Sequence, residues 1–362
     1  MNYTTQMDAT RRGLVLFKWR LYKKRALMTL LITILLLVTV GFLGFAEGAK
    51  EVGQTAGQKV ILKLGHGLPV SHPLNLAAEK FKELVEAKTD KMVQIDIFPA
   101  NQMGAPREQL EQTLTGVLDI AIVTIDLPTF LDEPYWRLLE SGYFFQSYEH
   151  ARSFFNSSLF KELTDKLERD KGILVIGTPW YYGLRNLTTA KKPIKNPEDL
   201  KGLKIRVPPA PGYLNTLKGM GANVTPVAFN ELYMALKTGI VDGQENPFAT
   251  IYEYKYYEAQ KYLNLTEHLQ SYNAAFANAK KIKSLPADYQ QAIFEAMQEA
   301  ADYNDKLIRD SEADYLKKLI EVGMVVVESD KKAFRDRTIQ FMQQEWYTPE
   351  EYAFYTKVQA IK

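Results

Sequence analysis

The sequence contains no cysteine and only four histidines. The lack of cysteine excludes disulfides, thiolate metal sites and a lipid anchor attached through cysteine. The histidines also lack the spacing of a zinc-binding helix motif, so no metal site is expected. Without disulfides, the stability of the fold must come from its hydrophobic core. The four histidines are His66, His72, His150 and His268.

Recognisable catalytic motifs are also missing. No glycine-rich phosphate loop follows an expected strand, and no Gly-x-Ser-x-Gly turn occurs. No pair of acidic residues has a spacing typical of acid–base catalysis. We therefore expect a protein that is not an enzyme and that needs no cofactor.

The first part of the chain is basic and then strongly apolar. Residues 1–46 carry seven basic residues and one acidic residue, and 26–46 contain no charged residue. This order is typical both of a secretory signal and of a membrane anchor, because the apolar run has an intermediate length. Small residues at Gly44 and Ala46 favour cleavage after Ala46. An anchor formed by 27–46 stays the alternative.

The rest of the chain is mildly acidic. The whole sequence has a formal net charge of +2, so the residues after Ala46 sum to −4. A body of this charge does not predict nucleic-acid binding. Together with the basic, apolar leader, it predicts an exported globular protein in the periplasm.

Strand and helix patterns alternate along the body of the chain. Amphipathic helices are expected over 74–85, around 110–117 and over 228–236. Between them lie segments with the alternating or continuous apolar character of strands. This order predicts an α/β fold with a largely parallel sheet. The expected strands are 60–64, 93–97, 120–123, 173–176, 203–207 and 324–327.

Two features indicate a pair of similar α/β lobes. The segment Thr-Gly-Val-Leu-Asp at 115–119 has a counterpart, Thr-Gly-Ile-Val-Asp, at 238–242. A long amphipathic helix is expected to begin after Ser284 and Pro286 and to end at Gly323. We interpret it as a helix that spans both lobes, although a simple surface helix has the same periodicity.

One arginine stands out by its position. Arg206 lies at the carboxyl end of an expected strand and is followed by Pro208 and Pro209. Open α/β sheets bind their ligands at the carboxyl ends of strands, and a guanidinium can hold a carboxylate through two parallel hydrogen bonds. Arg206 is therefore a candidate ligand-binding residue, with a solvated surface charge as the alternative.

Three ordered motifs resemble the substrate-binding subunits of TRAP transporters, the DctP-like family that binds four-carbon dicarboxylates. They are Gly-Leu-Arg-Asn-Leu-Thr-Thr at 183–189, Asn-Pro-Glu-Asp-Leu-Lys-Gly-Leu-Lys-Ile-Arg-Val-Pro at 196–208, and Gly-Gln-Glu-Asn-Pro at 243–247. The similarity runs from about residue 59 to near the C-terminus. It implies a two-lobed periplasmic-binding-protein-like fold, with crossing segments and a long helix that spans both lobes.

The resemblance also implies roles for individual residues. Arg206 is similar to the family's carboxylate clamp, Arg185 to a second pocket arginine, Asn246 to a pocket amide, and Phe229 to an aromatic residue against the ligand. Pro209 and Thr124 depart from the sialic-acid-binding branch, which argues against that sugar acid.

Further candidates lie beside these motifs. Trp180 and Tyr182 could stack on the ligand or pack at the lobe boundary. His66 could reach the ligand, although local hydrogen bonding near a helix start is the preferred role for that loop.

By the same resemblance, one lobe comprises 58–182 and 273–311, and the other comprises 183–272 and 312–362. The expected function is capture of a small organic acid by a monomer, which delivers it to TRAP membrane permease subunits. The alternatives are an exported enzyme that acts on an organic or sugar acid, and a membrane-tethered sensor of such an acid.

Overall fold

The computed structural model describes residues 59–362. The expected signal or anchor at 1–46 lies outside the described residues. Among the residues described, none of the helices is both long enough and apolar enough to span a bilayer.

The first lobe begins with three parallel strands. They are β1 (Val60–His66), β2 (Val93–Phe98) and β3 (Ile120–Thr124), with β1 between the other two. Helices α2 (Pro73–Lys88) and α3 (Pro106–Thr115) connect them. The three strands expected in this part of the chain are confirmed, because their apolar residues form the buried faces of the sheet.

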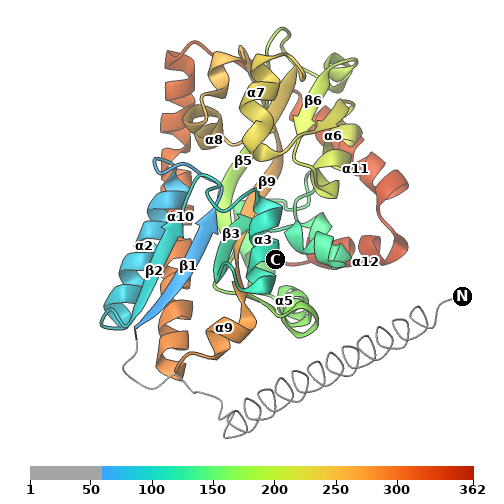
Figure 1. Ribbon diagram of the computed structural model, residues 1–362. Helices are drawn as coiled ribbons and strands as arrows, with labels where there is room; N and C mark the ends of the chain where they lie inside the picture. Colours follow the sequence, from blue (N-terminus) through green and yellow to red (C-terminus); the bar gives the residue numbers. More distant parts are fainter. Residues whose placement is uncertain (1–58) are drawn as a thin grey trace, which may run out of the picture. The chain divides into compact units, whose positions relative to one another are not determined.

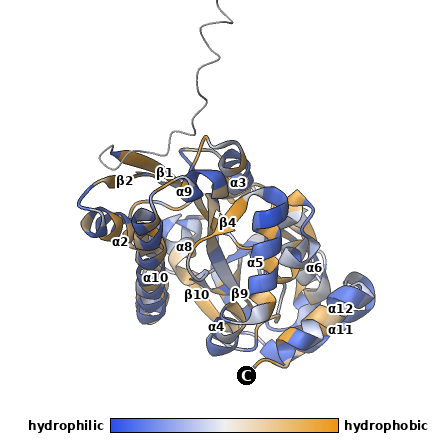
Figure 2. Cartoon of the chain, turned by 90° about the horizontal axis from the view of Figure 1, so that it is seen from below, coloured by the Kyte–Doolittle hydropathy of each residue, from blue (hydrophilic) through white to orange (hydrophobic). Residues whose placement is uncertain are grey.

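An aromatic-rich segment follows the first lobe's strands. It comprises the short helices η1 (Leu127–Leu131) and η2 (Pro134–Leu138), helices α4 (Tyr148–Phe155) and α5 (Ser158–Lys171), and strand β4 (Ile173–Val175). Its aromatic side chains form one hydrophobic cluster with residues of β3. In Figure 2, α5 carries both hydrophilic and hydrophobic residues, as expected of a helix that covers a core with one face.

The second lobe contains strands β6 (Lys204–Val207), β7 (Asn223–Pro226) and β8 (Gly243–Asn246), in which β6 pairs in parallel with both others. The helix expected over 228–236 is divided into a short 3-10 turn, η4 (Phe229–Glu231), and α7 (Leu232–Lys237). The other elements of this lobe are η3 (Pro197–Leu200), α6 (Pro211–Met220), α8 (Phe248–Glu253) and η5 (Tyr256–Glu258).

Two long strands join the lobes into one sheet. Strand β5 (Trp180–Thr189) pairs antiparallel with β9 (Tyr262–Asn278), which also pairs with β3. The resulting ten-stranded sheet has the order β2-β1-β3-β9-β5-β8-β6-β7, with β4 and β10 paired to β9. The sheet is therefore mixed: β1–β3 and β6–β8 pair in parallel, whereas β3, β4 and β5 pair antiparallel with β9, β5 pairs antiparallel with β8, and β10 pairs in parallel with β9.

A glycine permits one close approach in this crossing region. Gly183 of β5 has φ +124°, and a Cβ at this position would lie 2.8 Å from the Cβ of Pro247. The backbone conformation and the contact both favour glycine. The glycine of the first resemblance motif is thereby explained by the passage of β5 against the segment after β8.

Helix α10 (Ala287–Glu321) contains 35 residues and packs against α2 of the first lobe and α8 of the second. Figure 1 shows it running along both lobes from the short helix α9 (Ala279–Lys283) upward. The expected long helix that spans both lobes is confirmed. The chain then enters β10 (Val325–Glu328), as expected from the apolar run there.

The chain ends in three helices, α11 (Lys331–Phe341), the π-helical turn η6 (Met342–Trp346) and α12 (Pro349–Gln359). Helix α12 lies against the first lobe, where Glu351 pairs with Arg137 and Val358 joins the aromatic cluster. The lobe limits stay a prediction, but they place α12 in the second lobe, whereas its contacts are with the first.

Candidate functional site

A cavity of about 190 Å³ lies between the two lobes. Its walls come from the segments that follow β1, β2, β3, β6 and β7, from the end of β3, and from the crossing strands β5 and β9. Its position at the carboxyl ends of parallel strands is where open α/β sheets bind ligands. Its polar lining residues are Arg107, Thr124, Tyr182, Arg206 and Asn273, and the other lining residues carry apolar side chains or, at Gly67, none.

Arg206 reaches this cavity from β6 and is fully buried, with 0% of its surface exposed. Its Nε donates a hydrogen bond to the carbonyl oxygen of Val227 over 2.9 Å. Its terminal nitrogens Nη1 and Nη2 have no hydrogen-bond partner among residues 59–362. Two parallel donors at a cavity wall therefore stay free to bind a ligand.

Burial lowers the pKa of Arg206 to about 10, against the opposing influence of Tyr256 and Glu245. The side chain thus keeps its positive charge at neutral pH. A buried charge without a paired partner is unfavourable in a protein interior. A carboxylate in the cavity would supply both the opposite charge and two acceptor oxygens.

Two aromatic candidates line the same cavity as Arg206. The guanidinium carbon of Arg206 lies 6.0 Å from the ring centroid of Phe229. The hydroxyl of Tyr182 accepts a hydrogen bond from Thr250 over 2.6 Å. The structure therefore brings together Arg206, Phe229 and Tyr182, three of the residues selected from the sequence.

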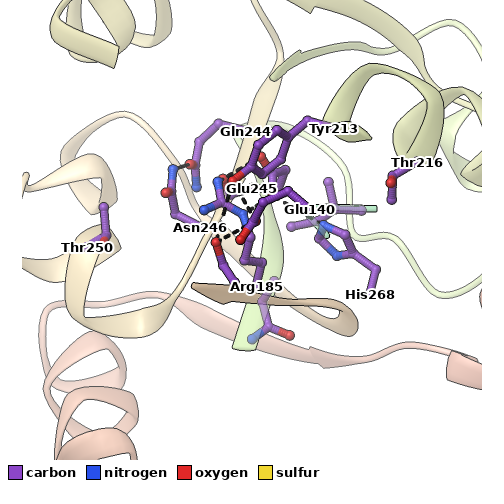
Figure 3. Close-up of polar contacts among 12 residues, drawn as sticks. Glu140, Arg185, Tyr213, Thr216, Gln244, Glu245, Asn246, Thr250 and His268 are labelled. Atoms are coloured by element: carbon purple, nitrogen blue, oxygen red, sulfur yellow. Dashed lines mark hydrogen bonds and ion pairs between the residues drawn. The ribbon is translucent and has the colours of Figure 1, made fainter. Parts of the chain in front are cut away.

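Arg185 does not line the cavity, because its guanidinium is engaged by a carboxylate of the protein itself. Its Nε and Nη2 donate to Oε2 and Oε1 of Glu245 over 2.5 and 2.9 Å, as Figure 3 shows. Nη2 also donates to the main-chain oxygen of Glu245 over 2.8 Å. Both side chains are buried. The expected contact of Arg185 with the ligand stays a prediction, and its bonding in this structure is to Glu245.

The pKa values of the pair reflect this contact. Burial lowers the pKa of Arg185, but the charge and hydrogen bonds of Glu245, together with Tyr213 and Tyr182, outweigh burial and raise it. Burial would likewise raise the pKa of Glu245, but Arg185 and His268 lower it to about 2. Both groups are therefore charged at neutral pH. His268, whose pKa burial lowers, lies with its Nε2 3.3 Å from Oε2 of Glu245.

Three other residues selected from the sequence lie outside the cavity wall. The side-chain amide of Asn246 donates to Oε1 of Gln244 over 2.5 Å. Trp180 is buried in the core of the first lobe. His66 accepts a hydrogen bond from the main-chain nitrogen of Leu68 and lies 3.1 Å from Asn75. For His66 the structure shows the preferred alternative of local bonding, and burial lowers its pKa to about 4.

Sequence reasoning missed two polar residues of the wall. Arg107, in the first turn of α3, pairs with Glu111 over 2.9 Å and lies 4.4 Å from the ring of Phe130. Asn273 of β9 faces Thr124 across the sheet. Neither could be selected, because β9 was not predicted and an arginine in an exposed first turn has no distinctive pattern. Among residues 59–362, no cluster of histidine and acidic side chains could hold a metal ion.

A second buried carboxylate lies near the Arg185–Glu245 pair. Glu140 accepts hydrogen bonds from the hydroxyls of Tyr213 and Ser271 over 2.6 and 2.7 Å, and from the main-chain nitrogen of Tyr272. Burial raises the pKa of Glu140 to about 8, with a further contribution from Asp126. Figure 3 shows Glu140 and Tyr213 beside Arg185 and Glu245.

This raised pKa predicts a pH-dependent stability. Since folded Glu140 holds its proton up to about pH 8, it contributes stability that is complete below the unfolded pKa of about 4.3 and lost as the pH rises through 8. The free energy of unfolding should fall by a few kcal/mol between about pH 5 and 8. Urea titrations at several pH values measure this slope. Glu140→Gln should flatten it, and an unchanged slope in that variant would contradict the assignment.

Comparison with known proteins addresses the identity of this two-lobed chain. Residues 64–348 match the family described as bacterial extracellular solute-binding protein, family 7, or DctP. The chain belongs to this family. It is a family of substrate-binding proteins and not of enzymes, and its members are extracellular proteins of bacteria.

Individual members of the DctP family agree with this result. The chain is 31% identical to the 2,3-diketo-L-gulonate-binding periplasmic protein YiaO of Escherichia coli over 242 residues. The aligned region covers 67% of this chain and 73% of that protein. A TRAP periplasmic solute-binding protein of Roseobacter denitrificans, solved with L-galactonate, superposes with a TM-score of 0.78 at 29% identity, covering 84% of this chain and all of that one. A TRAP protein of a Polaromonas species, solved with D-erythronate, has a TM-score of 0.76 at 30% identity, covering 84% and 99%.

The fold and the general function expected from the sequence are therefore confirmed. The chain has the two-lobed fold of TRAP solute-binding proteins and is a member of that group. Neither alternative, the exported enzyme or the tethered sensor, gains support from these relatives. Which residues contact the ligand stays a prediction for all seven candidates.

Proposed function

We propose that this solute-binding protein captures one organic acid in the cavity between its lobes and delivers it to a TRAP membrane permease. The observation that carries the proposal is the charged, buried guanidinium of Arg206, which lines the cavity and whose two terminal nitrogens have no protein partner in the described chain. Solved relatives hold sugar acids such as L-galactonate and D-erythronate, each of which carries a carboxylate.

Closure of the lobes on the acid accounts for capture without chemistry. In the proposed division, the lobes comprise 58–182 with 273–311 and 183–272 with 312–362. Binding would neutralise Arg206, which otherwise stays a buried charge without an opposite charge, so the closed state is favoured mainly with the acid present. In this scheme Phe229 and Tyr182 cover the ligand, and Arg185 and Asn246 support the wall near Arg206.

The cellular location of the protein is inferred from its N-terminal segment. The basic and apolar segment at 1–46 is proposed to export the chain to the periplasm, with cleavage after Ala46 or retention of 27–46 as an anchor. Mass determination of the mature N-terminus distinguishes the two. An N-terminus near Glu47 supports cleavage, whereas one that still contains 27–46 supports the anchor.

The charge requirement gives the direct test of the function. A thermal-shift screen of the exported protein should find at least one small carboxylic acid that stabilises it, by about 2.7 kcal/mol at a hundred times the dissociation constant. The control for each acid is its primary amide, which has the same shape without the charge. The amides should give no shift. Equal shifts by acid and amide would contradict a site built around Arg206.

A further inference from the structure

The composition of the cavity walls indicates what kind of molecule binds at Arg206. Apart from Arg206, they are formed mainly by hydrocarbon side chains from both lobes. Leu68, Leu74 and Ile122 come from the first lobe, together with Leu127 and Phe130 from the segment after β3. The second lobe adds Pro208 to Ala210 and Ala228 with Phe229. A ligand held by Arg206 therefore projects the rest of its body against apolar surface.

The wall has few other polar groups, and they do not form a row along its length. The Tyr182 hydroxyl accepts a hydrogen bond from Thr250 and keeps one O–H to donate, and the half-exposed Arg107 pairs with Glu111 through its Nε. Thr124 and Asn273 are paired residues of β3 and β9, so their side chains lie at the same place in the wall. Together they can form hydrogen bonds with one additional polar atom of a ligand, but not with several atoms along its length.

The nearby polar side chains outside the wall are occupied as well. The amide of Asn246 donates to Gln244, and Gln244 donates to Thr188 over 2.9 Å. Arg185 is held by Glu245 through its Nε and Nη2. A second carboxylate on the ligand would therefore have to compete with Glu245 for the guanidinium behind the wall.

We infer that the natural ligand is a monocarboxylate with a compact hydrocarbon body, rather than a sugar acid or a dicarboxylate. This inference rests on the proposed function, because it takes the carboxylate at Arg206 as given. The predominantly apolar lining of the cavity suits an aliphatic or single-ring acid.

The physical reason is the cost of unpaired groups. Each ligand hydroxyl that leaves water for an apolar wall loses hydrogen bonds that the wall does not replace. A second carboxylate loses far more, since it is charged. The same wall gains from every methylene that it covers. Selectivity should therefore follow the number of polar atoms on the body of the ligand.

Three acids with six carbons differ mainly in the polar atoms on the body of the ligand, and they test this selectivity. Hexanoate has one carboxylate and a hydrocarbon body, adipate has a second carboxylate, and gluconate has five hydroxyls. Calorimetry on the exported protein should show hexanoate binding about a hundredfold more tightly than either of the others. Tighter binding of gluconate or adipate would overturn the inference about the ligand class.

The Arg206→Gln variant separates this inference from the proposed function. If gluconate or adipate binds best and the variant abolishes that binding, the function stands and only the ligand class is wrong. If binding of the tightest of the three is unchanged in the variant, the proposed function and the inference both fail. If hexanoate binds best and the variant abolishes its binding, both are supported.

A wall variant tests the same point from the side of the protein. Ile122→Thr places a hydroxyl in the wall, and Ile122→Val removes the same volume without it. Relative to the valine variant, the threonine variant should shift the ratio of hexanoate to gluconate affinity about tenfold toward gluconate. Ala228→Ser, at a half-buried position of the second-lobe wall, should shift it in the same direction and serves if Ile122→Thr does not fold. An unchanged ratio in the folded variants would overturn the inference.

Discussion

Replacing Arg206 by alanine should weaken binding of the acid by about 2–5 kcal/mol, which is roughly 30-fold to several thousand-fold in dissociation constant. The variant removes the only guanidinium of the cavity wall that is both buried and free of a protein carboxylate in the described residues. The carboxylate of the ligand would then be desolvated without an opposite charge. Isothermal titration of wild type and variant with the same acid measures the loss.

Lysine at the same position should not restore the affinity. The guanidinium of Arg206 is held by its Nε bond to Val227 and presents two parallel donors. An ammonium group has neither that bond geometry nor the two-pronged fit to a carboxylate. Recovery of wild-type affinity by Arg206→Lys would mean that charge alone matters and that the fixed geometry does not.

Arg107 provides the matched control in the same cavity. It also lines the wall, but its side chain is about half exposed and already pairs with Glu111. Arg107→Ala should change the affinity by no more than about 1 kcal/mol. A loss of affinity as large as that of Arg206→Ala would indicate that the carboxylate of the ligand binds nearer to Arg107, toward the rim of the cavity.

The stability of the unliganded protein gives a second and independent result. Removing a buried charge that lacks a protein partner relieves the cost of its burial. Arg206→Met should therefore leave the unliganded protein at least as stable as wild type in urea unfolding, while it abolishes binding. A purely structural arginine would show the opposite result, with a clear loss of stability.

The local pattern of the sequence was sufficient to predict most of the first lobe. Strands β1, β2 and β3 alternate or are continuously apolar, and α2 repeats its apolar residues at helical spacing. The length of α10 was likewise predictable from its stripe and from Pro286 and Gly323 at its ends. These elements were predictable because their buried positions are apolar: both faces of β3 are buried, and the stripe of α10 contributes to the hydrophobic clusters of both lobes.

The crossing strands could not be predicted in the same way. Strand β9 contains buried polar residues, among them Asn264, Thr266, His268 and Ser271, that a core strand normally lacks. Their partners lie in β5, β8 and the Glu140 segment, which are far away in the sequence. Buried polar residues whose hydrogen-bond partners are distant in the sequence produce a local pattern that predicts a loop instead of a strand.

The site shows the same division between local and tertiary information. Arg206 was selected because a strand end followed by two prolines is a local signal. The engagement of Arg185 by Glu245 was not anticipated, since the two residues are 60 positions apart and meet only where β5 pairs with β8. The resemblance motifs contain both residues, but they predicted a role only for Arg185 and no contact between the two.

That pair leads to the second large expected effect. Glu245→Ala should destabilise the protein by about 3–5 kcal/mol, because it leaves the buried guanidinium of Arg185 without its bidentate partner. Arg185→Ala should have a similar effect by leaving the carboxylate unpaired. Urea unfolding at neutral pH measures both losses. Glu111→Ala, which breaks an exposed pair of the same type, is the control and should cost less than about 1 kcal/mol.

The double variant Arg185→Met with Glu245→Leu decides whether the pair acts as a unit. Replacing both charges by apolar groups leaves no buried charge unpaired, so the double variant should be much more stable than either alanine variant. If it is instead as unstable as the sum of the two single losses, the charges act separately. Acid binding should be weakened but retained in the double variant, because Arg206 keeps its place through Val227. Complete loss of binding there would mean that Arg185 contacts the ligand directly, as the family resemblance predicts, after exchange of Glu245 for the carboxylate of the acid.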